Sequence, residues 1–255
     1  MQQKMIKSKI AIARLTNLIV AICLQIGFQI TAQSAENIIL VTGFEPFGGG
    51  VTNSSWEAVK PLAGKHYSHA DVVIAQLPVV WGEAEAKLRT LIKIHQPKLV
   101  VSFGQAGSEP VRLETTARNH RGSIPDNKAA LPDSEVIDAQ SPATLDSTLP
   151  LAIIENHLRE ADIPVRLSED AGTYLCNAIF YALMNNPVAE WAKSVPRGFI
   201  HLPPLGTSVK TASGKTIIFD KALLAKTAAI IVETSAARLE DARLNIDRSH
   251  APAWE

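Results

Sequence analysis

Cys176 is a candidate nucleophile because it lacks a cysteine with which to form a disulfide. The chain has two cysteines, and Cys23 falls in a leader-like segment, so the mature protein keeps a single thiol. Gly172 interrupts the preceding residues, and the apolar run after Cys176 predicts a helix with the thiol in its first turn. Unpaired backbone N–H groups and the helix dipole favour a thiolate there. We therefore expect a reactive, ionised sulfur, although a lone cysteine is more often a packed structural residue.

His201 is the candidate proton carrier for this thiol. The run Gly-Phe-Ile-His at 198–201 predicts an apolar strand that ends at the histidine, because Pro203 and Pro204 follow. Open α/β sheets build their sites at the carboxyl ends of such strands. A histidine at a strand end is also common as a hydrogen-bonded structural residue. Nucleophilic catalysis by a cysteine and a histidine is therefore a hypothesis at this point.

The segments that must position these residues alternate between strand and helix. Apolar runs typical of buried parallel strands lie at 38–42, 72–78, 99–103, 165–167 and 198–201. Helices are predicted through Trp56, Val59 and Leu62 and over 83–95, 149–161, the residues after Cys176, and about 219–239. This alternation predicts a single-domain α/β/α sandwich, phosphorylase/hydrolase-like, with a central, mostly parallel sheet.

The segment from Gln105 to Leu145 breaks this alternation. It contains charged residues, two glycines and four prolines, and no regular pattern stands out in it. An irregular stretch of this length inside a domain is more often functional than idle, so we expect it to contribute to the site. The last residues, 245–255, have the composition of a polar tail.

Residues 1–35 have the three parts of a signal peptide. An apolar stretch at 15–28 is followed by small residues at Ala32 and Ser34, and four basic residues precede it: Lys4, Lys7, Lys9 and Arg14. The apolar stretch is shorter than the ~20 residues that span a bilayer, which favours cleavage over an uncleaved anchor. We expect a mature domain over 36–255 that is secreted or periplasmic, with no stable membrane insertion after cleavage; anchoring by an uncleaved leader is the alternative.

Charge and composition exclude several classes of function. The chain has 25 Lys and Arg against 25 Asp and Glu, and no basic run follows the leader, so nucleic-acid binding has no electrostatic support. The glycines at 48–50 lack the Lys-Ser/Thr ending of a phosphate-binding loop, which favours a tight turn. The histidines have no spacing typical of a metal site. We expect neither a metal nor a cofactor.

Four short blocks occur in a fixed order along the chain. They are Val-Thr-Gly-Phe-Glu-Pro-Phe-Gly-Gly at 41–49, Leu-Glu-Thr-Thr-Ala-Arg-Asn at 113–119 with Ile-Pro-Asp-Asn at 124–127, Ala-Gly-Thr-Tyr-Leu-Cys-Asn at 171–177, and Gly-Phe-Ile-His at 198–201. With these blocks the chain resembles the pyroglutamyl peptidase I (pyrrolidone-carboxylate peptidase) family of cysteine peptidases. The resemblance extends from about Ile38 to Pro204.

The resemblance implies a cysteine omega-peptidase that hydrolyses the amide bond after an N-terminal pyroglutamyl residue. Cys176 would attack the carbonyl carbon, His201 would carry the proton, and Glu114 would orient the imidazole. Taken alone, Glu114 lies between Arg112 and Arg118, a pattern more typical of a solvated ion pair. The resemblance also implies peptide substrates with N-terminal pyroglutamate and a homo-tetramer.

The resemblance also assigns a pocket for the lactam ring. The ring is flat and uncharged and calls for apolar walls, which the resemblance places at Phe44 and Phe47. Asn53 would help to shape the pocket, and backbone around Gln105 would bind the ring amide. The two phenylalanines are also compatible with ordinary core packing.

The chain departs from the pattern of the family at two basic positions. Thr115 stands where the family usually has an arginine, and Ser123 stands where it has a basic residue before Ile-Pro-Asp. Arg121 is the candidate to replace the second. The missing charges motivate one alternative, a catalytically inactive protein that binds lactams or peptides. A second alternative is an amidase for other small lactams.

Overall fold

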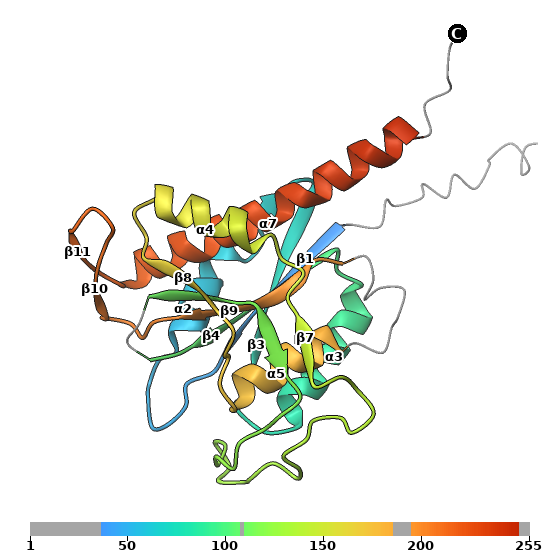
Figure 1. Ribbon diagram of the computed structural model, residues 1–255, viewed down its shortest axis with the longest axis vertical. Coiled ribbons are helices and arrows are strands. Elements are labelled where there is room, and N and C mark those ends of the chain that lie inside the picture. The colour runs from blue at the N-terminus through green and yellow to red at the C-terminus, as the bar shows by residue number, and fades with distance from the viewer. Residues whose placement is uncertain (1–36, 108–109, 186–194, 250–255) are drawn as a thin grey trace, which may run out of the picture. The chain divides into compact units, whose positions relative to one another are not determined.

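The computed structural model describes residues 37–107, 110–185 and 195–249, with side chains described up to residue 239. The predicted leader lies outside these residues. A seven-stranded sheet has the order β2-β3-β1-β4-β9-β5-β8 (Figure 1). Its strands are β1 (Asn37–Phe44), β2 (His66–Tyr67), β3 (Ala70–Leu77), β4 (Leu99–Gln105), β5 (Val111–Glu114), β8 (Val165–Ser168) and β9 (Arg197–Leu202).

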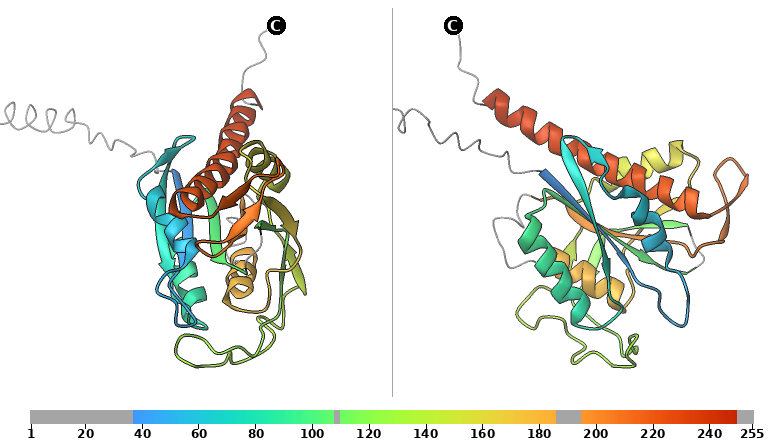
Figure 2. Two further views of the ribbon diagram at one scale, coloured as in Figure 1. Left: turned by 90° about the vertical axis from the view of Figure 1, so that its left-hand side faces the viewer. Right: turned by 180° about the vertical axis from the view of Figure 1, so that it is seen from behind.

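Helices cover both faces of this sheet, as the two further views make plain (Figure 2). One face packs against α2 (Ser54–Val59), α4 (Leu151–Glu160) and α7 (Lys221–Ser249), together with the short 3-10 helix η1 (Lys60–Leu62). The other face packs against α3 (Glu83–His95) and α5 (Leu175–Met184). None of the helices in the described part of the chain is long and apolar enough to cross a membrane. The predicted α/β/α sandwich is confirmed.

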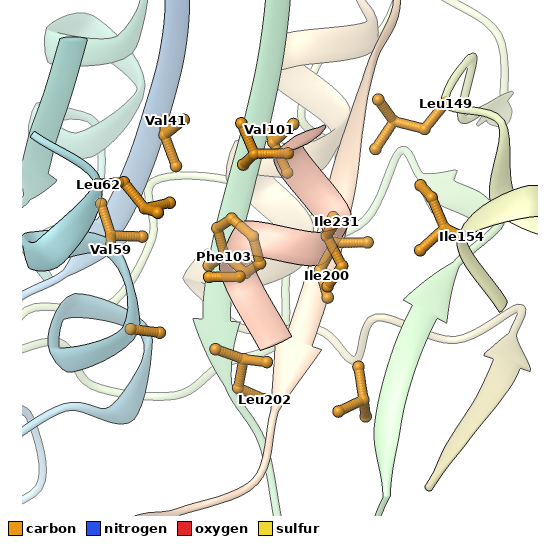
Figure 3. Close-up of a cluster of buried hydrophobic side chains, with 14 of the residues drawn as sticks. Val41, Val59, Leu62, Val101, Phe103, Leu149, Ile154, Ile200, Leu202 and Ile231 are labelled. Atoms are coloured by element: carbon orange, nitrogen blue, oxygen red, sulfur yellow. The ribbon is translucent and has the colours of Figure 1, made fainter. Parts of the chain in front are cut away.

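The central strands are apolar on both sides because each side faces a layer of helices. In β4, Val101 and Phe103 belong to the core under α2 and α7, whereas Val100 belongs to the core under α3 and α5. Figure 3 shows the first of these cores, where Phe103 and Val101 lie beside Ile200 of β9. Continuous β-branched runs without alternation follow directly from burial on both faces. For this reason the strands at the centre were predictable from the sequence.

The sheet is mostly parallel, with reversals at β2 and β5. Strand β1 runs parallel to β3 and β4, and β4 runs parallel to β9. Strand β5 pairs antiparallel with β9 and parallel with β8. It lies inside the segment that was predicted to be irregular, which also contributes β6 (Thr116–Arg118) and β7 (Thr144–Asp146). The prediction missed a strand here because β5 has only four residues, too few for its alternation of apolar and charged side chains to stand out.

The carboxyl-terminal part contains more regular structure than the sequence predicted. Helix α7 continues to Ser249, so the expectation of a polar tail from Asn245 is wrong for residues 245–249. No glycine or proline occurs between 221 and 249 to end the helix earlier. A hairpin of β10 (Ser208–Lys210) and β11 (Thr216–Ile218) precedes the helix and was not predicted.

A buried arginine joins the helix of Cys176 to the strand of His201. Arg197 opens β9, and its guanidinium donates to the carbonyl oxygens of Leu183, Met184 and Val195 at 3.1, 3.3 and 2.9 Å. Two of these carbonyls belong to the last turn of α5, which leaves such groups without partners in the helix itself. The contact fixes the carboxyl end of α5 against the beginning of β9. The two elements that carry the candidate catalytic residues are therefore held together at a point remote from both.

Candidate active site

Cys176 lies in the first turn of α5, as the sequence predicted. Gly172 has a φ of +79°, a left-handed conformation that suits glycine, and its N–H donates to the Oδ1 atom of Asp170 at 3.0 Å. This turn directs the chain into Tyr174, the extended residue that precedes the helix. No side-chain hydrogen bond caps this end of α5. The backbone N–H groups of the first turn are thus available for a ligand.

The alternation of β9 turns His201 toward α5. Phe199 belongs to the core between the sheet and α5, while Ile200 belongs to the core on the opposite face, so His201 points to the same side as Phe199. On the adjacent strand the residue opposite His201 is Gly104. A Cβ atom built on Gly104 would lie 2.8 Å from the Cys176 sulfur and 2.7 Å from the Phe199 ring. The sulfur therefore occupies space next to His201 that only a glycine leaves open.

Glu114 holds the imidazole from the third strand. Its Oε1 atom lies 2.7 Å from the Nδ1 atom of His201, and both side chains are almost completely buried. A carboxylate accepts only, so Nδ1 carries the proton and donates it to Glu114. The Nε2 atom is left with its lone pair, which is the form that accepts a proton from a thiol. Glu114 and His201 are thus in contact, and His201 and Cys176 line the same pocket.

Arg112 is a fourth member of this group, and sequence reasoning did not assign it a role in catalysis. It faces His201 directly across the β5–β9 pair. Its Nε atom lies 3.2 Å from the Oε1 atom of Glu114, and its Nη2 atom lies 3.2 Å from the Nδ1 atom of His201. The alternation Val-Arg-Leu-Glu at 111–114 was the signal that could have found it, because residues 112 and 114 of a strand share one face.

The ionisation of the site differs from the expectation. Burial, and then the negative charge of Glu114, raises the pKa of the Cys176 thiol from 9.0 to about 12, and Arg112 opposes this only in part. Burial also lowers the pKa of His201 below its ordinary value of 6.5, despite the hydrogen bond that the imidazole donates to Glu114. Both shifts favour a neutral thiol and a neutral imidazole in the resting site. This differs from the expected thiolate, because burial outweighs the helix dipole in setting the pKa of Cys176.

The candidate residues open into a pocket of about 480 Å³. This volume lies within the usual range of small-molecule sites. Cys176 is partly accessible from it, whereas Glu114 lies behind His201 and does not reach it. All of the predicted substrate-binding residues take part in its walls, which among the described residues are Phe44, Phe47, Asn53, Val79, Gln105, Ala106, Gly107, Arg112, Ile124, Ala171, Gly172, Thr173, Tyr174, Leu175, Cys176 and His201.

Aromatic rings make up much of the pocket wall. Phe44 is 2% exposed, and its ring centre lies 6.4 Å from that of Phe199. Phe47 is half-buried and lies 6.4 Å from Tyr174, whose ring meets Trp81 edge to face at 5.4 Å. Phe44 thus serves both the core and the pocket. The aromatic pair of Tyr174 and Trp81 was not predicted.

Asn53 and Gln105 shape the pocket through contacts with the chain. The Asn53 side chain accepts from the backbone N–H and the hydroxyl of Ser55 at 3.0 and 2.7 Å, which caps α2. Its amide donates to the carbonyl oxygen of Glu45 at 2.9 Å. The Oε1 atom of Gln105 accepts from the backbone N–H of Ser54 at 2.8 Å. These contacts bind the loop after β1 to the end of β4, on either side of the pocket.

Two carboxylates that the sequence did not single out hold the loops of the pocket. Glu45 accepts through Oε1 from the backbone N–H of Val79 at 2.9 Å and from the Asn127 amide at 3.1 Å. Asp126 accepts through Oδ2 from the backbone N–H of Trp81 at 3.0 Å. Together they join the loops after β1, after β3 and after β6. Their place within two of the quoted blocks was the available signal.

Arg121 does not replace the missing basic residue of the pocket. Its Nη2 atom pairs with the Oε1 atom of Glu85 at 3.2 Å, and the side chain is not among those that line the cavity. Thr115 donates its hydroxyl to the carbonyl oxygen of Ser168 at 3.1 Å, away from the pocket. Arg112 is therefore the permanently charged side chain among the described residues of the wall. Across the described part of the chain, no three His, Cys, Asp or Glu side chains are grouped as a metal site.

Comparison with known proteins identifies the family of the chain. The sequence model of the pyroglutamyl peptidase family matches residues 37–238. The chain belongs to this family. The pyrrolidone-carboxylate peptidase of Bacillus velezensis is 36% identical over 208 residues, which cover 81% of this chain and 95% of that protein. The one from Klebsiella pneumoniae is 41% identical over 180 residues, which cover 69% and 83%.

Solved structures of pyroglutamyl peptidases share the fold. That of pyroglutamyl peptidase I from Bacillus amyloliquefaciens has a TM-score of 0.70 at 34% identity, covering 79% of this chain and 95% of that chain. The pyrrolidone carboxyl peptidase from Thermococcus litoralis has a TM-score of 0.72 at 30% identity, covering 81% and 96%. The expected family of cysteine peptidases and its α/β fold are both confirmed.

Gly104→Ala should displace the sulfur of Cys176. The new Cβ atom would lie within 3 Å of both the sulfur and the Phe199 ring, so at least one of them must move. We expect kcat/KM for a pyroglutamyl reporter amide to fall by about 10²-fold, because a nucleophile displaced by a fraction of its reach loses alignment. Circular dichroism and thermal unfolding serve as controls for the fold. Unchanged kcat/KM in the folded variant would contradict the placement of the sulfur.

Alkylation of Cys176 by iodoacetamide should report a neutral resting thiol. At pH 8 we expect labelling at least about tenfold slower than in the urea-denatured chain, rising about tenfold per pH unit as the thiolate fraction grows. Mass spectrometry of the tryptic peptides separates Cys176 from Cys23, and the denatured chain is the matched control. Fast labelling that stays constant between about pH 5 and pH 8 would instead show a preformed thiolate paired with imidazolium.

Proposed function

We propose that Cys176, His201 and Glu114 carry out the pyroglutamyl peptidase reaction in this pocket. The bond cleaved is the amide that joins an N-terminal pyroglutamyl residue to the rest of a peptide. The observation that carries the proposal is the 2.7 Å contact between the Nδ1 atom of His201 and Glu114, beside the pocket that Cys176 and His201 share. Because this contact occupies Nδ1, the Nε2 atom of His201 remains as the acceptor for the thiol proton.

The first half of the reaction forms an acyl-enzyme. As the Cys176 sulfur attacks the pyroglutamyl carbonyl carbon, its proton passes to the Nε2 atom of His201. The resulting imidazolium is stabilised by the Glu114 carboxylate. His201 then gives this proton to the leaving nitrogen, the carbon–nitrogen bond breaks, and the shortened peptide departs with a free amine. The pyroglutamyl group remains bound to the sulfur as a thioester.

The second half releases pyroglutamate and restores the thiol. Water attacks the thioester carbonyl carbon while His201 takes one of its protons. The carbon–sulfur bond then breaks, and the same proton returns from Nε2 to the sulfur. The backbone N–H of Cys176 lies in the first turn of α5, and we assign it to the oxyanion that forms in both halves. The neutral resting pair supports a scheme in which charge separates only as the substrate reacts.

The walls of the pocket support selection of a lactam. Phe44 and Phe47 offer apolar faces to a flat, uncharged ring, and Tyr174 and Ile124 add to the same enclosure. The end of β4 at Gln105 and Ala106 provides backbone beside the ring amide. No carboxylate lines the described part of the pocket, so a free α-amine would find no partner for its positive charge.

Cys176→Ser tests the nucleophile. We expect the release of a chromogenic amine from a pyroglutamyl arylamide to fall by about 10³-fold or more, because a hydroxyl is a much weaker nucleophile beside a neutral imidazole. Cys23→Ser is the matched control and should keep full activity.

A panel with prolyl, glutaminyl and six-membered lactam arylamides tests the ring preference. Turnover by Cys176→Ser equal to wild type would refute the proposed nucleophile, and equal turnover of all lactams would favour a broader amidase.

We propose further that the chain is exported and that the leader is removed near residue 35. The basic residues, the apolar stretch and the small residues of 1–35 support this proposal. Expression of the full chain should yield an active protein outside the cytoplasm whose first residue lies near position 35. Leu18→Arg with Val20→Arg should retain the protein inside at full length. Native protein that starts at Met1 in the membrane fraction would favour an uncleaved anchor.

Gel filtration of the exported protein tests the homo-tetramer that the resemblance implies.

A further inference from the structure

Three charged or titratable side chains meet at the wall of the pocket, which Arg112 and His201 line and Glu114 does not reach. The Oε1 atom of Glu114 is 2.7 Å from the Nδ1 atom of His201 and 3.2 Å from the Nε atom of Arg112. The Nη2 atom of Arg112 is 3.2 Å from the same Nδ1 atom. Arg112 and His201 are opposite residues of the antiparallel pair, so the backbone itself imposes their proximity. The guanidinium is thus a fixed neighbour of the imidazole.

Arg112 and Glu114 would require opposite protonation states of the Nδ1 atom of His201 in order to form hydrogen bonds with it. A guanidinium only donates, so it can bond to Nδ1 only when that nitrogen has no proton. In that tautomer Nε2 carries the proton and cannot accept one from Cys176. The bond from Nδ1–H to the carboxylate is shorter and charge-assisted, so it prevails over the 3.2 Å contact. Arg112 therefore contacts the imidazole without a hydrogen bond to Nδ1, whose proton is donated to Glu114.

The charges of this group balance only while His201 is neutral. Glu114 is completely buried, and its Oε2 atom has no hydrogen-bond partner among the described residues. A buried carboxylate without full hydrogen bonding needs a nearby positive charge. Arg112, whose side chain is 17% exposed, supplies that charge at 3.2 Å. With Arg112 in place, the addition of a proton to His201 gives the buried group a net positive charge.

We propose that Arg112 is a positioning residue that neutralises the buried Glu114 carboxylate and so keeps His201 unprotonated in acidic medium. The proposal depends on the role of His201 as the base of the reaction. Arg112 touches neither the scissile bond nor the thiol in this scheme. It acts through Glu114 and His201 by setting the lowest pH at which the base is available.

The other charges around His201 agree with this assignment. Cys176 faces it from α5 and is a neutral thiol at rest, and Asp170 acts on it from the loop before that helix. Glu114 and Asp170 raise the pKa of His201, whereas burial and Arg112 lower it. Arg112 also lowers the pKa of Cys176. Loss of the guanidinium charge should therefore move the ionisation of both groups to higher pH.

Arg112→Gln tests this prediction through the pH dependence of kcat/KM. In wild type, activity is lost as the pH falls through the pKa of His201, so the acid limb should lie below about 6.5. In Arg112→Gln this limb should move up by roughly one pH unit, so that activity below the limb falls about tenfold relative to wild type. Arg112→Lys keeps a positive charge and should leave the limb within a few tenths of a unit.

Arg121→Gln is the matched control. Its side chain is also 17% exposed and also pairs at 3.2 Å with a buried glutamate, Glu85, but it does not line the pocket. Its acid limb should coincide with that of wild type. An Arg112→Gln limb that also coincides with wild type would overturn the proposal. A loss of activity that is equal at every pH would overturn it too, because it would indicate a structural role only.

A direct titration separates this proposal from that of the triad. The imidazole of His201, followed by NMR with His201→Gln to assign its signal, should titrate below 6.5 in wild type and higher in Arg112→Gln, whether or not His201 is the base. If Cys176→Ser retains full activity but the titration shifts as expected, the triad fails and the electrostatic role stands. Should Arg112→Gln not fold, a wild-type midpoint at or above 6.5 overturns the proposal by itself.

Discussion

The buried hydrogen bond between Glu114 and His201 is the contact on which the rest of the site depends. In the antiparallel pair of β5 and β9, Glu114 is opposite Phe199 and His201 is opposite Arg112. The bond is therefore a diagonal contact between strands, which long side chains on one face of a sheet can span. Reversal of β5 places both Glu114 and Arg112 within reach of His201. The antiparallel strand β5 therefore places one negative and one positive side chain, Glu114 and Arg112, next to the same imidazole.

The sequence specified the parts of the fold that local patterns determine. Strands β1, β4 and β9 are continuous apolar runs because helices cover both of their faces, and α3 occurs at the predicted residues. Strand β5 was missed because its pairing with β9 joins residues 87 positions apart in the chain, as with Glu114 and His201. The alternation within its four residues is a weak signal, and pairing over such a distance gives no local indication of the partner strand. For the same reason the sequence suggested a solvated ion pair for Arg112, whereas the structure places it beside His201.

The raised pKa of Cys176 differs from the expected thiolate because the effect of burial is larger than that of the helix dipole. A helix dipole is worth about 0.3–1 kcal/mol for a nearby charge and up to ~2 kcal/mol in partly buried geometry. Burial of an ionisable group can shift its pKa by up to several units, and each unit corresponds to about 1.4 kcal/mol. The sequence revealed the helix end but not the ring of Phe199 and the glycine backbone against the sulfur. With burial included, two charges rather than four remain in the apolar site at rest, which is the less costly arrangement.

The quoted sequence blocks combine chemistry with support for the pocket. Glu45 lies between Phe44 and Phe47 in the sequence, but its carboxylate accepts from the backbone N–H of Val79 and does not line the pocket. Asp126 likewise accepts from the backbone N–H of Trp81 rather than entering the cavity. Each carboxylate has its charge satisfied by donors of a neighbouring loop, so the loops are fixed without placing negative charge in the pocket. An uncharged lactam requires this separation, because a wall that presented a carboxylate would favour ordinary peptides with a protonated amine.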